Sequence, residues 1–188
     1  MRSHDWIRAG LGLLSEEGEH ALTLERLCAD MRKTRGSFYH HFSDMNAFIG
    51  AMLDQWTEDQ THMPIRRADE ERDAFARMKR LDRVVAGLDH KLDQIIRAWS
   101  IRDPRAKRAI DRVDKLRVSY IALLYGGFGL NGDDAERLAE LEYTLFLGAQ
   151  QKFELMTGVE ALRSLRLFRE MAIQWIKQRG GELPNELI

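Results

Sequence analysis

Apolar residues recur every three or four positions along nearly the whole chain, the spacing that places them on one face of an α-helix. The first such run spans residues 6–14, with Ser3 or Asp5 available as the N-cap and Gly18 as a C-terminal stop. The chain contains three prolines in 188 residues and lacks alternating runs of β-branched residues. The pattern therefore predicts an all-α protein of about nine helices.

Three further helices are predicted close behind the first one. Thr23 precedes one short helical pattern and Thr34 precedes another that runs to about His41. Each threonine can cap its helix by accepting a hydrogen bond from a backbone N–H of the first turn. A longer helix is expected from Asp44 and should end before Pro64, because proline disfavours a helix interior.

The rest of the chain is predicted to form a larger helical bundle. Asp103 and Pro104 supply an N-cap followed by proline at the first helical position. The long helix that follows is broken by the sequence GGFGLNGDD. We therefore divide the chain into a smaller N-terminal domain at residues 1–46 and a larger domain at residues 47–188.

The composition suits a folded protein, with 44% apolar and 31% charged residues. A formal net charge of −1 does not by itself indicate a nucleic-acid-binding protein. Residues 26–41, however, hold four Arg or Lys against one Asp, with two histidines beside them. This local excess of positive charge is a candidate contact surface for a polyanion.

Cys28 is the single cysteine, so no disulfide can form within one chain, as expected in a reducing cytosol. The N-terminus MRSHDWIRAG lacks the apolar stretch of a signal peptide. The longest nearly apolar run, residues 120–130, is about half of the roughly 20 residues that a membrane span needs. We expect a cytoplasmic protein without a membrane partner.

Two apparent motifs carry no chemistry in this sequence context. Residues 127–132 fit the letters GxGxxG, but a helix rather than a strand precedes them, and Asp133 and Asp134 would repel a phosphate. The motif is interpreted as a turn that needs positive φ. His40 and His41 are adjacent, so on a helix they point about 100° apart and do not suit one metal ion. We expect no metal, no cofactor and no catalytic residues, and hence not an enzyme.

The patterns at residues 23–31 and 34–41 are two short helices joined by a tight connection, which is the layout of a helix-turn-helix. In that motif the second helix enters the major groove of DNA. Phe38 and Phe42 are expected to face inward and hold the motif together. The alternative is an exposed polar helix that merely packs through these two phenylalanines.

The polar residues of the second helix have side chains suited to DNA. Ser37 and Tyr39 offer hydroxyls to phosphate oxygens, and the tyrosine ring can touch a thymine methyl. Arg35 and His40 can reach guanine or phosphate and are the candidate base contacts. Gly36 allows the helix to approach the DNA backbone closely.

The stretch TLERLCADMRKTRGSFYHHF and the helix before it resemble the DNA-binding domain of the TetR (tetracycline-repressor-like) family of bacterial regulators. The resemblance covers roughly residues 5–56. It rests on Thr23, Leu27, Thr34, Gly36, Ser37, Phe38, Tyr39, His41, Phe42 and Phe48. It implies nine helices, a homodimer built mainly from the last two helices, and a cavity in the larger bundle whose small-molecule effector releases double-stranded operator DNA.

Three positions depart from the family pattern. Arg32 stands where glycine usually turns the chain, and Lys33 stands where a small apolar residue is usual. Both add positive charge that can favour phosphate. Met45 stands where the family commonly has a lysine that holds a phosphate of the DNA backbone. That contact is lost here unless Arg32 or Lys33 takes the place of the lysine.

The sequence and the resemblance together define three sets of candidate residues. DNA contacts are expected at Arg32, Lys33, Thr34, Arg35, Gly36, Ser37, Tyr39, His40 and His41. Candidate effector contacts are the large side chains on the helices where the family places its cavity, namely Trp56, Trp99, Tyr120, Tyr125 and Phe128. Their character suggests an apolar or aromatic effector. Two apolar stripes on the last two helices, one for the core and one for a second copy, suggest a dimer interface at Leu138, Leu141, Leu145, Leu165, Phe168 and Trp175.

The leading hypothesis is a homodimeric, ligand-responsive regulator, most simply a repressor, that binds a palindromic operator. The first alternative is a helical module that binds a small molecule or a protein and keeps a non-functional helix-turn-helix. The second is an all-helical enzyme, for which the sequence offers no candidate residues.

Overall fold

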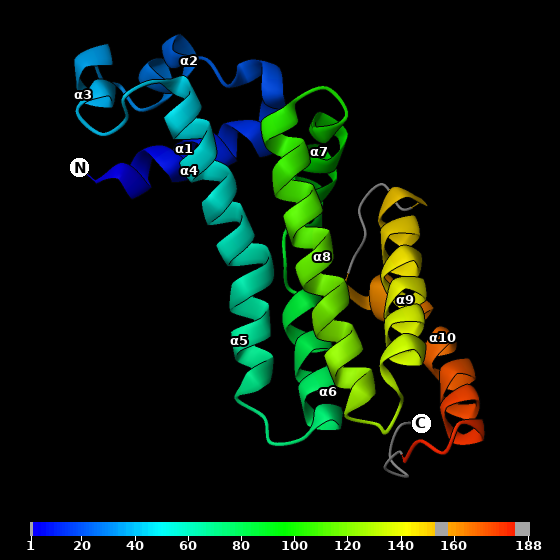
Figure 1. The fold of residues 1–188 in the computed structure, drawn as a ribbon. Helices are drawn as coiled ribbons and strands as arrows, with labels where there is room; N and C mark the ends of the chain where they lie inside the picture. Colours follow the sequence, from blue (N-terminus) through cyan, green and yellow to red (C-terminus); the bar gives the residue numbers. More distant parts are fainter. Residues whose placement is uncertain (1, 153–157, 183–188) are drawn as a thin grey trace. The chain divides into compact units, whose positions relative to one another are not determined.

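A computed structural model describes residues 2–152 and 158–182, and every regular element in this part of the chain is helical (Figure 1). The α-helices are α1 (Ser3–Glu17), α2 (Leu24–Asp30), α3 (Arg35–Tyr39), α4 (Met45–Thr57), α5 (Met63–Asp69), α6 (Ala74–Val85), α7 (His90–Ser100), α8 (Pro104–Gly126), α9 (Gly132–Lys152) and α10 (Gly158–Gln178). A 3₁₀ turn, η1 (Glu19–Ala21), and a π-helical turn, η2 (Glu58–His62), complete the set. The predicted all-α fold class is confirmed.

The chain forms two compact units. The first combines residues up to 59 with residues 91–111, and the second combines residues 60–90 with the chain from residue 112 onward. The first unit therefore includes α4 and α7 as well as the helix-turn-helix segment. The functional division at residue 46 that the sequence suggests stays a prediction.

The threonine and aspartate caps of the N-terminal helices are confirmed. Thr23 accepts a hydrogen bond from the backbone N–H three residues on at 3.2 Å, and Thr34 does the same at 3.3 Å. Asp44 caps α4 at 2.8 Å. The cap predicted for α1 is wrong: the N-cap is Arg2, and the Asp5 carboxylate instead accepts the Arg2 backbone N–H at 2.8 Å.

The helix that begins at α4 does not end before Pro64, contrary to the prediction. It continues through η2 into α5, where proline occupies the first turn. In a regular α-helix the proline ring would clash with the carbonyl of Gln60, and the i→i+5 spacing of a π turn relieves that conflict. The Gln60 carbonyl accepts a hydrogen bond from Arg117 at 3.2 Å, and the same guanidinium donates to Thr61 at 3.1 Å. Counted as one, this interrupted helix brings the α-helical segments of the described residues to the predicted nine.

The start and the end of α8 follow the prediction. Asp103 accepts the backbone N–H of Arg105 at 2.8 Å and pairs with its guanidinium, and this pairing together with the cap lowers the pKa of the carboxyl to about 2. At the other end, residues 127–131 form the turn between α8 and α9. Gly129 has a φ of 87°, which explains the glycine at that point.

An aromatic cluster forms the core of the first unit around Phe38, which is fully buried. Its ring centroid lies 5.4 Å from that of Trp6, 5.4 Å from that of Phe42 and 5.5 Å from that of Phe48. A methyl group on Gly10 of α1 would lie 2.6 Å from the Phe48 ring, so glycine is required for α1 and α4 to pack this closely. Because five residues cannot sustain a helix alone, these contacts hold α3 in place.

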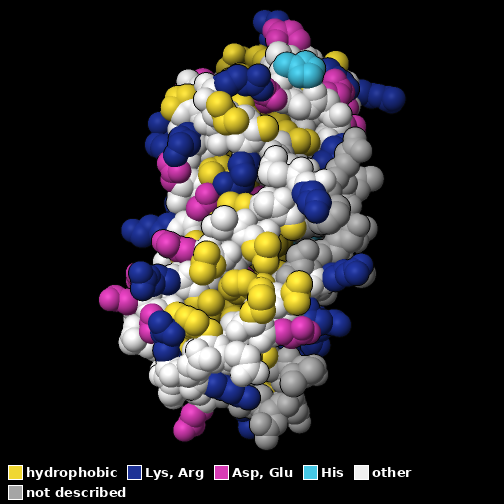
Figure 2. Space-filling model, turned by 90° about the vertical axis from the view of Figure 1, so that its right-hand side faces the viewer, with side chains coloured by type: hydrophobic (Ala, Val, Ile, Leu, Met, Phe, Trp, Pro, Cys, Tyr) yellow, Lys and Arg dark blue, Asp and Glu magenta, His cyan; other side chains and the backbone are white. Residues whose placement is uncertain are grey.

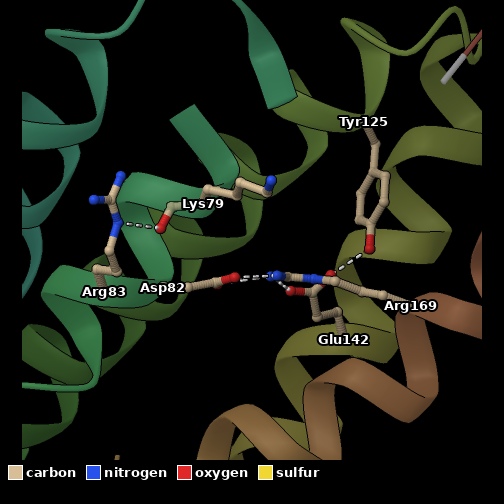
Figure 3. A network of polar contacts seen from close by, with 6 residues as sticks. All are labelled: Lys79, Asp82, Arg83, Tyr125, Glu142 and Arg169. Atoms are coloured by element: carbon tan, nitrogen blue, oxygen red, sulfur yellow. Dashed lines mark hydrogen bonds and ion pairs between the residues drawn. The ribbon is translucent and has the colours of Figure 1, made fainter. Parts of the chain in front are cut away.

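The second unit packs α5, α6, α8, α9 and α10 around a common apolar core. A charged network crosses this core (Figure 3). Arg169 of α10 pairs with Asp82 of α6 and with Glu142 of α9, and Tyr125 of α8 donates its hydroxyl hydrogen to the same glutamate. Burial raises the pKa of Asp82, although the Arg169 guanidinium acts in the opposite direction. One arginine thus compensates two carboxylates from two other helices.

Replacing this arginine should destabilise the second unit strongly. Arg169→Ala leaves two carboxylates in the core without a cation, and breaking a buried pair in this way costs about 3–5 kcal/mol. The exposed pair of Lys107 and Asp111 provides a control, and Lys107→Ala should cost about 0.5 kcal/mol or less. Urea denaturation followed by circular dichroism measures both values. Equal losses in the two variants would contradict a structural role for the network.

Candidate nucleic-acid interface

The connection between α2 and α3 is a tight turn that places Arg32 in a strained conformation. Arg32 has a φ of 51°, the one positive value among the non-glycine residues that the structure describes. Its N–H bonds to the Ala29 carbonyl at 3.2 Å, and the N–H of Lys33 bonds to the Cys28 carbonyl at 2.9 Å. These two bonds form a Schellman motif with the left-handed position filled by arginine. The conformation costs about 1–2 kcal/mol relative to a right-handed one, so stability alone would favour glycine here.

The predicted DNA contacts lie together on the turn and on α3. Seven of them are exposed, namely Arg32, Lys33, Thr34, Arg35, Gly36, Tyr39 and His40, while Ser37 and His41 are half-buried. Tyr39 leaves 54% of its surface exposed, although its ring packs edge-on against that of Phe38 at 5.5 Å. Phe38 and Phe42 are buried, as the sequence predicts. The helix thus presents its polar side to solvent and is anchored by its apolar side.

Two of the basic residues are paired with acids in this unit. Arg26 pairs with Glu17 of α1 and with Asp30 of its own helix. Arg35 pairs with Glu25 across the two helices of the motif. The positive charge counted along the sequence is therefore partly compensated, and Glu25 is a neighbour that the sequence analysis did not single out.

The sequence predicts no metal site at the histidines or the cysteine. Within the described residues, no group of three or more His, Cys, Asp or Glu side chains is placed to hold a metal ion. The rings of His40 and His41 contact each other edge to face with centroids 5.1 Å apart. Cys28 is buried, and its desolvation raises the pKa of the thiol.

The five residues predicted to contact an effector are all buried, with exposures of 8% or less. The first unit contains Trp56 and Trp99, and the second contains Tyr120, Tyr125 and Phe128. In the second unit the rings of Tyr125 and Phe128 lie 6.0 Å apart, and the Tyr120 hydroxyl donates to Asp69 at 2.9 Å. The structure shows these side chains as core residues, so their contact with an effector stays a prediction.

The residues predicted at a dimer interface separate into two groups. Leu138 and Leu165 are buried in their own chain, and Phe168 and Trp175 pack against its core, so these four face inward. Leu141 and Leu145 of α9 are exposed.

Among the described side chains of α10, two further apolar ones are exposed, Leu167 and Met171, each with 61% of its surface open. The sequence analysis did not assign them, although their spacing of four residues places them on one side of the helix. Figure 2 shows hydrophobic side chains exposed together on the face that carries α9 and α10. In the described part of the chain, no helix is long and apolar enough to cross a membrane.

Comparison with known proteins agrees with this geometry. The family model of bacterial regulatory proteins of the TetR family matches residues 7–52, which is the segment from α1 into α4. No curated protein sequence matches the chain.

Solved structures share the fold over most of the chain. A TetR transcription regulator from Haloarcula marismortui has a TM-score of 0.76 at 18% identity, over 92% of this chain and 96% of that one. A transcriptional regulator from Rhodococcus sp. Rha1 has a TM-score of 0.75 at 14% identity, over 98% and 100%. The reduced form of NemR from E. coli has a TM-score of 0.74 at 16% identity, over 89% and 96%. The segment of residues 7–52 thus matches the TetR family of bacterial regulatory proteins, and the fold of the chain is the one found in solved structures of TetR-family regulators.

Proposed function

We propose that this protein is a cytoplasmic, ligand-responsive transcriptional regulator, most simply a repressor. It binds an inverted-repeat operator as a homodimer and is released from the DNA by a small molecule. The observation that carries this proposal is α3, a five-residue helix that exposes Arg35 and Tyr39, with the exposed His40 at its C-cap, while Phe38 anchors it in the core. A helix that is buried on one side and polar on the other suits insertion into a major groove.

The contacts expected on DNA fall into two kinds. The Tyr39 hydroxyl and the side chains of Arg32 and Lys33 are positioned beside α3 for phosphate oxygens, which fix the orientation of the protein. Arg35 and His40 are the candidates for base edges, because arginine can donate two parallel hydrogen bonds to guanine. Arginine at the strained turn supports this assignment, since Arg32 adds charge where glycine would add stability.

The dimer is expected to form through exposed apolar residues of the last two helices. Among the side chains that the structure describes there, Leu141, Leu145, Leu167 and Met171 are open. Large apolar side chains that gather on one face of a protein mark a site of association. A second copy of the chain is the simplest partner, because a two-fold dimer presents two recognition helices to an inverted repeat.

The effector is expected to act within the second unit. Its core includes the three aromatic residues Tyr120, Tyr125 and Phe128, so an apolar or aromatic compound remains the expected ligand class. The alternative function, a binding module with a non-functional helix-turn-helix, predicts ligand binding without sequence-selective DNA binding. The three experiments below separate the two functions.

Substitutions on α3 should separate phosphate contacts from base contacts. Tyr39→Phe keeps the ring against Phe38 and removes only the hydroxyl, so it should weaken binding to all DNA sequences by the same factor. Arg35→Ala should cost about 1–3 kcal/mol on the preferred duplex and relax one base position. The probe is the duplex that the wild-type protein enriches from a randomised library, and fluorescence anisotropy measures its affinity.

Arg83→Ala, which alters an exposed arginine of the second unit, is the matched control and should bind as the wild type does. Wild-type affinity in folded Tyr39→Phe and Arg35→Ala proteins would overturn the interface. Failure of the wild-type protein to enrich any sequence would favour the binding module.

Charged substitutions on the exposed apolar face should separate the dimer into monomers. Leu141→Glu and Met171→Glu would place charges where two copies meet, and the monomers should lose most of their operator affinity because the half-sites no longer bind as one unit. Ile101→Glu, at an apolar residue of the first unit that is 85% exposed, should leave the dimer intact. Light scattering at micromolar concentration measures the mass, and a monomeric wild type would contradict the proposal.

Effector and operator should weaken each other's binding by the same factor. Coupling between two sites is typically about 1–3 kcal/mol and is reciprocal. A compound that raises the melting temperature of the wild-type protein in a small-molecule screen supplies the ligand. Its calorimetric titration into free and into DNA-bound protein measures the coupling. Equal affinities in the two titrations would refute release by the ligand.

A further inference from the structure

An acidic residue lies on the surface that is proposed to meet DNA. Glu25 is in the first turn of α2, and its carboxylate accepts a hydrogen bond from the Nη2 atom of Arg35 on α3. Both side chains are exposed, at 64% for the glutamate and 65% for the arginine. The pair therefore links the two helices of the motif on their solvent side.

The pair is not explained by stability or by affinity for DNA. Ion pairs between exposed side chains contribute little to folding, because water and salt screen them. A carboxylate beside the recognition helix also repels phosphate and cancels one of the positive charges that attract it. Its placement therefore suggests an effect on how Arg35 is used.

We propose that Glu25 is a positioning residue that makes Arg35 selective for a guanine edge in the operator instead of for phosphate. The inference rests on the proposed function, because it takes Arg35 as a base contact. A guanidinium has five N–H donors, and the bond to Glu25 uses one of them. The remaining donors suffice for the two parallel bonds that guanine O6 and N7 accept.

Two physical effects support this assignment. The carboxylate restrains a long, flexible side chain before DNA arrives, so less rotamer entropy is lost when the base contact forms. The ion pair of Arg35 and Glu25 also has no net charge as a unit, so it gains less from the release of counterions at phosphates, which is the source of sequence-independent affinity. Both effects raise the ratio of specific to non-specific binding.

The structure offers a matched control in the same unit. Glu17 of α1 pairs with Arg26 of α2, which also joins two helices, but this pair does not include a residue of α3. Glu17→Gln removes an acid of the same kind and should not change base preference. Glu25→Gln keeps the size of the side chain and removes its charge.

The experiment compares five proteins: wild type, Glu25→Gln, Glu17→Gln, Arg35→Ala and the Glu25→Gln/Arg35→Ala double variant. Each is used to enrich duplexes from a randomised library. Its affinity is then measured for the wild-type consensus duplex and for a shuffled duplex at several salt concentrations.

We expect Glu25→Gln to bind shuffled DNA about two- to three-fold more tightly, with a steeper salt dependence. The ratio of consensus to shuffled affinity should fall roughly five-fold or more, with preference lost at the position that Arg35→Ala relaxes. In the double variant the glutamine should cause no further change in that ratio. A glutamate that merely stabilises the start of α2 would instead have the same effect with and without Arg35.

The inference is overturned if Glu25→Gln retains the wild-type ratio and base preference, or if its effect on the ratio persists undiminished without Arg35. In both cases the proposed function survives when the wild type still enriches an inverted repeat and Arg35→Ala weakens its binding. If the wild type enriches no sequence at all, the proposed function and this inference fail together.

Discussion

The burial of Phe38 is the contact on which the geometry of the N-terminal surface depends. The helix that carries it has five residues, which is too short to be stable in isolation. Rings from α1, from α4 and from the segment between α3 and α4 surround Phe38 and fix the rotation of α3 about its axis. That rotation leaves Tyr39 and His40 on the outside. Because the apolar side anchors α3, the turn before it can hold an unusual residue, an arginine with positive φ.

The second unit is held together by a different kind of interaction. Besides its apolar core, it contains a partly buried arginine that is shared by carboxylates from two other helices. Such a network adds little net stability over apolar packing but makes the loss of any member costly. Arg169 therefore links α10 to α6 and to α9. The helices α9 and α10 are the two that form the proposed dimer face, so the network holds them in a fixed arrangement.

The proposed DNA surface is a balance of charges and not simply a basic patch. The net charge of the chain is −1, and two of the four basic residues at positions 26–35 are paired with acids. Arg32 and Lys33 lie exposed at the turn before α3. Because long-range attraction to DNA is weak, short-range hydrogen bonds to the bases contribute a larger share of the binding energy. The expected consequence is that the surface selects DNA by sequence instead of binding any polyanion.

The sequence by itself determined the helical fold class, the caps at Thr23, Thr34 and Asp44, and the inward direction of Phe38, because these follow from local spacing and local hydrogen bonds. Only the tertiary structure decided that the helix continues past Pro64, since a guanidinium more than fifty residues away binds the carbonyl at the π turn. It also decided which apolar stripe faces inward, burying Leu138 and exposing Leu141, because helical spacing alone does not say which side meets the core. The pairing of Glu25 with Arg35 was likewise hidden, since it depends on the angle between two helices and not on any spacing along the chain.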